Sequence, residues 1–126
     1  MNRMLKHRRA AAAGIAALGC AIVVPVATSA AASEPKVVTK KVNVGDDFFK
    51  PTKLTINKKN AINFVWNKSN FDSHNVTLIK GPKGVKPFAS DIANSGYTFK
   101  RKLTKAGTYQ FDCSLHNEMT LRIKVR

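Results

Sequence analysis

Two alternating runs of residues flank the short segment 113–119, and this arrangement constrains the fold more than any other sequence feature. In the run before it, residues 108–112, aromatic residues alternate with polar ones. In the run after it, residues 119–126, apolar residues alternate with polar and basic ones. Alternation of this kind is typical of half-buried β-strands. The inward-facing set is expected to be Tyr109, Phe111, Cys113, Met119, Leu121, Ile123 and Val125.

The rest of residues 33–126 continues the pattern in shorter runs. Apolar or alternating segments predict further strands over residues 37–44, 53–56, 61–67, 74–80 and 97–103. Gly, Pro and Asn between these segments predict turns. Pro51 has no N–H to donate to a neighbouring strand, so it is not expected in the middle of a central strand. Nothing in these residues has the period of an amphipathic helix. About seven to eight short strands predict an all-β sandwich or barrel.

Three soft metal donors lie within residues 113–119: the thiol of Cys113, the imidazole of His116 and the thioether of Met119. A second imidazole, His74, stands 39 residues before Cys113, so only tertiary structure can bring it to the others. A sandwich allows this, because its loops cluster at its two ends. Two His and one Cys with a weak axial Met form the blue-copper electron-transfer site. We therefore expect these four residues to bind one copper ion, as Cu+ or Cu2+.

The first 32 residues have the pattern of a secretory signal peptide. A basic head is followed by an Ala-rich apolar stretch and then by small residues of the A-x-A type. We expect cleavage after residue 32, which leaves residues 33–126 as the copper-binding domain of an exported protein, periplasmic, extracytoplasmic or secreted. The alternative is an apolar stretch retained as a membrane anchor. After cleavage, every Cys, His and Met that remains belongs to the proposed site.

Other interpretations of the site residues remain open at this stage. Cys113 and His116 alone could form half of a zinc site, although zinc usually takes four strong ligands and Met is a poor one. A thiol hydrolase pair would need an orienting group and an oxyanion site, which the sequence does not supply. Asn75, beside His74, either bonds the backbone or sulfur of the Cys113 loop, and so helps to orient the ligands, or satisfies local backbone at a strand end.

The chain is strongly basic, with 22 Lys and Arg against seven Asp and Glu. Four of the basic residues lie in the first 32, so residues 33–126 carry a net charge of +11. The basic residues are spread along the domain, which favours a solvated surface. A charge of this size could also steer an acidic redox partner or hold the protein at an anionic cell envelope. Nucleic acid is not expected as a partner, since no recognition motif is present, and the domain is expected to be a monomer.

Residues 49–125 resemble the cupredoxins, particularly the small plastocyanin and amicyanin type. The resemblance rests on the order and spacing of five motifs: Phe49-x-Pro51, residues 65–67, residues 73–76, residues 106–109, and Cys113-x-x-His116-x-x-Met119. It implies a Greek-key β-sandwich with His74, Cys113 and His116 as strong ligands and Met119 as the axial ligand. It also implies that electrons pass through a partly exposed edge of His116.

The resulting hypothesis is an exported type 1 copper protein that transfers single electrons between redox partners, such as a cytochrome and a copper oxidase or dehydrogenase. It is not expected to be an enzyme, because multicopper oxidases need more His than the two that residues 33–126 contain. One alternative is a copper-binding carrier or scavenger of the cell envelope. Another is a metal-free, adhesion-type sandwich.

Overall fold

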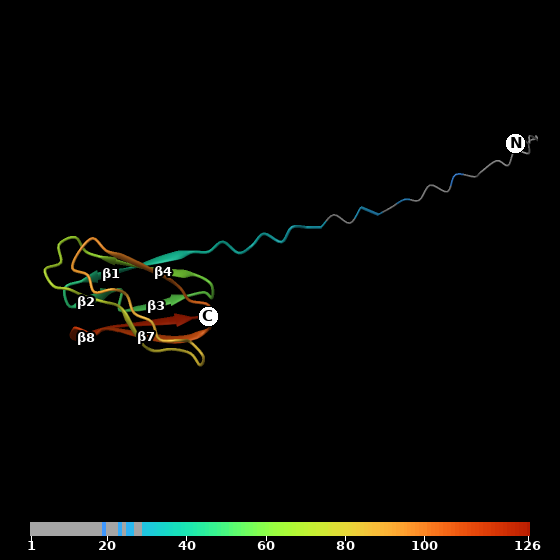
Figure 1. Cartoon of the computed structure of the whole chain (residues 1–126). Coiled ribbons are helices and arrows are strands. Elements are labelled where there is room, and N and C mark those ends of the chain that lie inside the picture. Colours follow the sequence, from blue (N-terminus) through green and yellow to red (C-terminus); the bar gives the residue numbers. More distant parts are fainter. Residues whose placement is uncertain (1–18, 20–22, 24, 27–28) are drawn as a thin grey trace, which may run out of the picture. The chain divides into compact units, whose positions relative to one another are not determined.

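The computed structural model describes Gly19, Val23, Pro25, Val26 and residues 29–126 (Figure 1). The chain divides into two units, Met1–Ser33 and Glu34–Arg126, and the second holds all of the described secondary structure. Most of the predicted signal peptide lies outside the described residues, and its cleavage stays a prediction. Within the described residues, no helix has the length and apolar character needed to cross a membrane.

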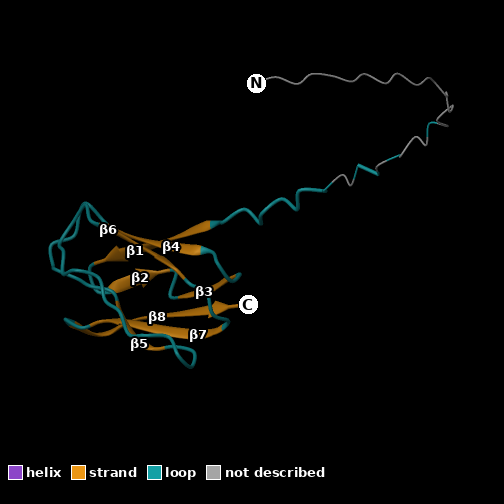
Figure 2. Ribbon diagram, turned by 45° about the vertical axis from the view of Figure 1, so that its right-hand side comes forward, coloured by secondary structure: helices purple, strands orange, loops and turns teal. Residues whose placement is uncertain are grey.

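Eight strands form two four-stranded sheets that face each other (Figure 2). One sheet has the order β2-β1-β4-β6 and the other β3-β8-β7-β5. Each sheet contains one parallel pair, β1 with β4 and β3 with β8, while the other pairs are antiparallel. The predicted Greek-key all-β sandwich is confirmed. The strands are β1 Thr39–Gly45, β2 Phe48–Lys50, β3 Lys53–Ile56, β4 Ala61–Trp66, β5 Thr77–Lys80, β6 Thr98–Lys102, β7 Gly107–Cys113 and β8 His116–Val125.

The core lies between the two sheets and follows the alternation of the sequence. In β8 every second residue from Met119 to Val125 is buried, and the residues between them are exposed. In β4 the inward side chains of Ile62, Phe64 and Trp66 are buried in the same way. The Phe64 ring contacts that of Phe111 on the opposite sheet, with centroids 5.7 Å apart. Each such buried side chain contributes about 1.5–3 kcal/mol through the hydrophobic effect, which is what holds the sheets together.

Two strand boundaries near the proposed site differ from the sequence expectation. Strand β8 begins at His116 rather than at residue 119, because His116 pairs directly with Cys113 across a two-residue turn. Strand β5 begins at Thr77 rather than at residue 74. His74 instead forms an isolated bridge with Ala93, in which each backbone N–H donates to the other residue's carbonyl, at 2.9 and 3.0 Å.

The pairing registers place several loops at one end of the sandwich. The ends of β1 and β4 lie together, since Val44 is paired with Trp66. The end of β7 lies beside the start of β5, since Asp112 is paired with Thr77. Residues 46–47, 67–76 and 114–115 therefore meet at this end, which we call the site end.

Candidate metal centre

The hairpin between β7 and β8 positions two of the predicted donors by itself. Cys113 is the last residue of β7, faces inward and is 3% exposed. His116 is the first residue of β8 and the Cα partner of Cys113. The Cys113 Sγ atom lies 3.5 Å from His116 Nδ1. The thiol and the imidazole therefore face each other across a tight turn.

His74 reaches the same point from the loop between β4 and β5. Its side chain is fully buried, and its carbonyl oxygen accepts a hydrogen bond of 3.2 Å from Trp66 Nε1. Its Nδ1 atom lies 4.0 Å from Cys113 Sγ and 3.1 Å from His116 Nδ1. The structure thus brings together the side chains of His74, Cys113 and His116, whose ligand atoms all lie within 4.8 Å of one another.

Asp46, in the turn between β1 and β2, fixes the tautomer of His74. Its Oδ1 atom lies 3.0 Å from His74 Nε2. A carboxylate can only accept a hydrogen bond, so Nε2 carries the proton and donates it. In the neutral imidazole Nδ1 then has a free lone pair, and it is this atom that faces Cys113 and His116. A carboxylate is one of the common partners for the outer nitrogen of a metal-binding His.

Asp46 is itself held in place by the neighbouring loop. Its two carboxylate oxygens accept hydrogen bonds from the backbone N–H groups of Phe71, at 3.0 Å, and Asp72, at 3.2 Å. The hydrogen bond with His74, followed by that from Phe71, lowers the pKa of Asp46 below its ordinary value. The group is therefore an ionised acceptor at neutral pH.

Asn75 joins the His74 loop to the hairpin. Its Oδ1 accepts a hydrogen bond of 2.9 Å from the backbone N–H of Ser114, and its Nδ2 donates one of 2.9 Å to Ser114 Oγ. The backbone N–H of Asn75 points at Cys113 Sγ, with the nitrogen 3.5 Å from the sulfur. Of the two roles left open by the sequence, these contacts match the bond to the Cys113 loop.

Met119 is the third residue after His116 and faces inward from β8. It is 1% exposed and belongs to the same buried cluster as Cys113. Its neighbours along the inward row of the strand are apolar, so the thioether is shielded from water. Its role as the axial ligand stays a prediction.

The donor set fits a single soft metal ion. With bonds of about 2.1 Å to nitrogen and about 2.3 Å to sulfur, one ion can bridge two nitrogens up to about 4.2 Å apart, or a nitrogen and a sulfur up to about 4.4 Å apart. The observed separations of 3.1, 3.5 and 4.0 Å all fall within these limits. Two imidazoles and a thiolate with Met as the remaining donor suit copper, whereas zinc usually takes a fourth strong ligand.

The outer edge of His116 is the part of the site that reaches the surface. The side chain is 25% exposed, and its Nε2 atom lies 3.6 Å from Asp47 Oδ1. Asp47 and Asp72 form a second group with His116 whose ligand atoms lie within 4.8 Å of one another, but both carboxylates are exposed. The site therefore has a buried interior and a negatively charged rim.

Sequence reasoning missed Asp46 and Ser114 as partners of the site residues. Residues 45–47 carried only a turn signal, and Asp46 stands 28 residues before His74. Ser114 carried no signal beyond its place between Cys113 and His116. Both roles depend on which loops meet at the site end, and a local pattern does not contain that information.

Comparisons with known proteins agree with this geometry. The sequence pattern of the family described as copper binding proteins, plastocyanin/azurin family, matches residues 36–126. No curated protein sequence matches the chain. Among solved structures, a reduced amicyanin variant has a TM-score of 0.62 at 18% identity, covering 70% of this chain and 82% of its own. A second amicyanin variant, oxidised, has a TM-score of 0.61 at 17% identity, covering 69% of this chain and 81% of its own.

A larger enzyme contains a similar unit. The copper-containing nitrite reductase from Thermus scotoductus SA-01 is 30% identical, with a TM-score of 0.61, and the match covers 88% of this chain. This chain corresponds to only 27% of that enzyme. The amicyanin likeness, at its low identity, shows the fold, and the family pattern over residues 36–126 shows the membership. With its two-sheet sandwich and converging sulfur and imidazole donors, the chain belongs to the plastocyanin/azurin family of copper-binding proteins.

Proposed function

We propose that this protein is an exported type 1 copper protein that transfers single electrons between redox partners. The observation that carries the proposal is the assembly of one buried thiol and two imidazoles, with the tautomer of His74 set by Asp46. His74, Cys113 and His116 would hold the copper, with Met119 as the axial ligand. A bound copper ion supplies the one-electron couple.

The residues around the site suit electron transfer because they hold the metal donors rigidly. His74 is fixed by the Ala93 bridge, and Cys113 and His116 are the paired ends of one hairpin. Asn75 ties these two parts together. A framework that keeps the donors in one arrangement in both oxidation states lowers the barrier to electron transfer, because few atoms have to move.

The partner would dock at the site end, where His116 reaches the surface. Two apolar side chains are exposed at this end, Leu115 in the hairpin turn at 47% and Phe71 in the neighbouring loop at 89%. Apolar contact around the exposed imidazole would bring a second redox centre close to the site. We propose a redox protein as the partner and a monomeric state for the chain.

The sign of charge on that partner stays a prediction. The net charge favours an acidic partner, whereas Asp46, Asp47 and Asp72 make the site end locally negative. The dependence of the electron-transfer rate on salt would decide between them, because added salt slows a reaction between opposite charges.

We also propose that the protein is not an enzyme by itself. Among the four donors only an edge of His116 is open to solvent, while His74, Cys113 and Met119 are buried, so the site offers little room for a substrate. Export rests on the N-terminal pattern alone. Intact mass of the secreted protein would test it, with loss of residues 1–32 expected and a full-length chain contradicting cleavage.

The test of the proposed function is the colour of the copper form. We expect residues 33–126 with Cu(II) to be intensely blue from thiolate-to-copper charge transfer, and Cys113→Ala to be colourless. A colourless unsubstituted protein would contradict the proposal. Stopped-flow mixing then separates electron transfer from copper carriage: a reduced cytochrome should react faster than a copper-accepting chelator removes the metal. The reverse order would favour the carrier.

A further inference from the structure

Acidic side chains gather around His116, whereas hollows on the surface of the domain are lined by cations. Four hollows on the surface of the described residues are each lined by Lys or Arg and by no Asp or Glu. The two that adjoin lie on the outer face of sheet β3-β8-β7-β5. They share Lys53 and Arg122, and their volumes are about 540 and 250 Å3. We call them together the basic groove.

The register of the strands forces like charges together in the basic groove. Lys53 and Arg122 are direct Cα partners on the parallel strands β3 and β8. Lys124, two residues further along β8, lies on the same outer face, because Leu121 and Ile123 point into the core. Like charges directly opposite each other destabilise a sheet. Within residues 29–126 none of these three cations forms an ion pair, so the repulsion is not offset.

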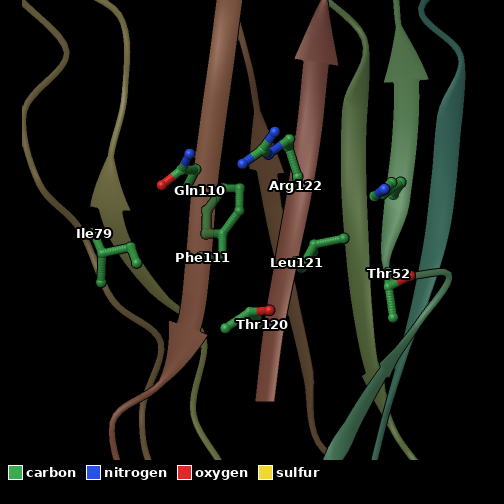
Figure 3. A pocket seen from close by; sticks show the side chains of 8 residues that line it. Thr52, Ile79, Gln110, Phe111, Thr120, Leu121 and Arg122 are labelled. Atoms are coloured by element: carbon green, nitrogen blue, oxygen red, sulfur yellow. The ribbon is translucent and has the colours of Figure 1, made fainter. Parts of the chain in front are cut away.

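Neutral hydrogen-bond donors complete the basic groove. Gln110 on β7 is the Cα partner of Arg122, and Figure 3 shows the two side chains next to each other. Thr52 and Thr120 add hydroxyl groups to the lining. The carboxylate residue Asp112 is the Cα partner of Thr120 but does not line either hollow. Several donors around an Arg fork suit the multiple acceptor oxygens of a phosphate group.

The cations also form a line. Arg122 and Lys124 are two residues apart on β8, which places them about 6.8 Å apart on one face of the strand, and Arg126 follows two residues later, just after β8 ends. A row of positive charges at a regular spacing matches a linear chain of negative groups better than a single small anion. No exposed aromatic side chain lines the basic groove, so the bases of a nucleic acid would find nothing to stack on.

From this juxtaposition we propose that the basic groove is a binding site for a linear, phosphate-bearing polyanion. The groove lies on the face of the sheet, whereas His116 lies at the strand ends, so the polymer would hold the domain and leave the site end free. The proposal needs no metal and does not rest on the proposed electron transfer.

The test is binding of inorganic polyphosphate, measured by calorimetry on the copper-loaded protein and again on the metal-free protein. The double variant Lys53→Gln with Arg122→Gln should bind at least about tenfold more weakly, since two charge-assisted contacts are lost. The matched control is Lys41→Gln with Lys100→Gln. These two lysines are both Cα partners of Asn63 on the other sheet, and the control removes the same net charge.

The control double variant should weaken polyphosphate binding by less than about threefold. This smaller loss is the effect of the reduced net charge alone. An equal loss in both double variants would show that binding follows net charge and would overturn the proposal. Nuclear magnetic resonance gives a second readout: backbone shifts on adding polyphosphate should concentrate on β3, β8 and Gln110. Shifts centred on β1, β4 and β6 would contradict the assignment.

Two further probes test the chosen class of ligand. Vesicles of anionic phospholipid should bind more weakly than polyphosphate at equal phosphate concentration, because a flat surface cannot follow the groove. A single-stranded oligonucleotide with the same number of phosphates should bind no more tightly than polyphosphate. Tighter binding of either probe, lost in the Lys53 and Arg122 double variant, would replace the proposed polymer with a lipid surface or a nucleic acid.

Discussion

Replacing Asn75 with Ala tests how firmly the two halves of the site are joined. The amide is 7% exposed and makes two hydrogen bonds of 2.9 Å to Ser114, one from its Nδ2 to Oγ and one accepted by its Oδ1 from the backbone N–H. Each contributes about 1 kcal/mol net. Ser114 is exposed, so water can satisfy its N–H after the substitution and the larger penalty of a buried unpaired group is avoided. We expect Asn75→Ala to lower the free energy of unfolding by about 2 kcal/mol.

The measurement is thermal and urea unfolding of the metal-free residues 33–126. For a domain of this size, about 2 kcal/mol corresponds to a fall in Tm of about 8–16 °C. Ser114→Ala is the matched control, because it removes the hydroxyl but keeps the N–H bond to Asn75 Oδ1. It should cost about half as much. If Asn75→Ala costs no more than Ser114→Ala, the N–H bond contributes nothing and the reasoning about this link is refuted.

Three further predictions concern the site and the core. Asp46→Ala should weaken copper binding by about 10–100-fold in a competition titration, because the tautomer of His74 is no longer fixed; an unchanged affinity would contradict that role. Met119→Gln should lower the reduction potential in voltammetry while copper stays bound, and no change would mean that Met119 is not axial. Burial raises the pKa of Tyr109 above its ordinary value of 10.0. The Tyr109 hydroxyl therefore loses its proton at a lower pH in the unfolded chain than in the folded one, so the free energy of unfolding should fall as pH rises above about 10. Urea unfolding of Tyr109→Phe should show a smaller loss of stability over this pH range. A pH profile identical to that of the unsubstituted protein would contradict the role of Tyr109.

Local patterns were sufficient for the strands because the side chains of a strand alternate between its two faces. The alternation in residues 119–126 and 61–67 predicted which residues are buried, and the structure buries Phe64 and Leu121 accordingly. The short strand β2, with a single buried residue, Phe49, gave no such pattern on its own. Alternation reports the faces of a strand but not its neighbours, so the parallel pairs of β1 with β4 and β3 with β8 could not be predicted.

The charge pattern shows the same division. Composition established that residues 33–126 carry a net charge of +11, and the spread of the basic residues along the sequence favoured a solvated surface. Placing Lys53 opposite Arg122, and Asp47 and Asp72 beside His116, depends on strand register and on loop packing. These fix the local field that a partner meets, which a net charge does not describe.

By itself the sequence determined the donor types and the spacing that keeps Cys113, His116 and Met119 on one hairpin, because residues so close along a chain cannot separate far. Only the tertiary structure decided that His74 meets them with its Nδ1 free. Asp46 binds the ring from the turn between β1 and β2, Phe71 holds Asp46, and Trp66 holds the His74 backbone. The physical reason is range: backbone geometry acts over a few residues, whereas the orientation of a buried imidazole is set by whichever distant groups the packed sheets bring against it.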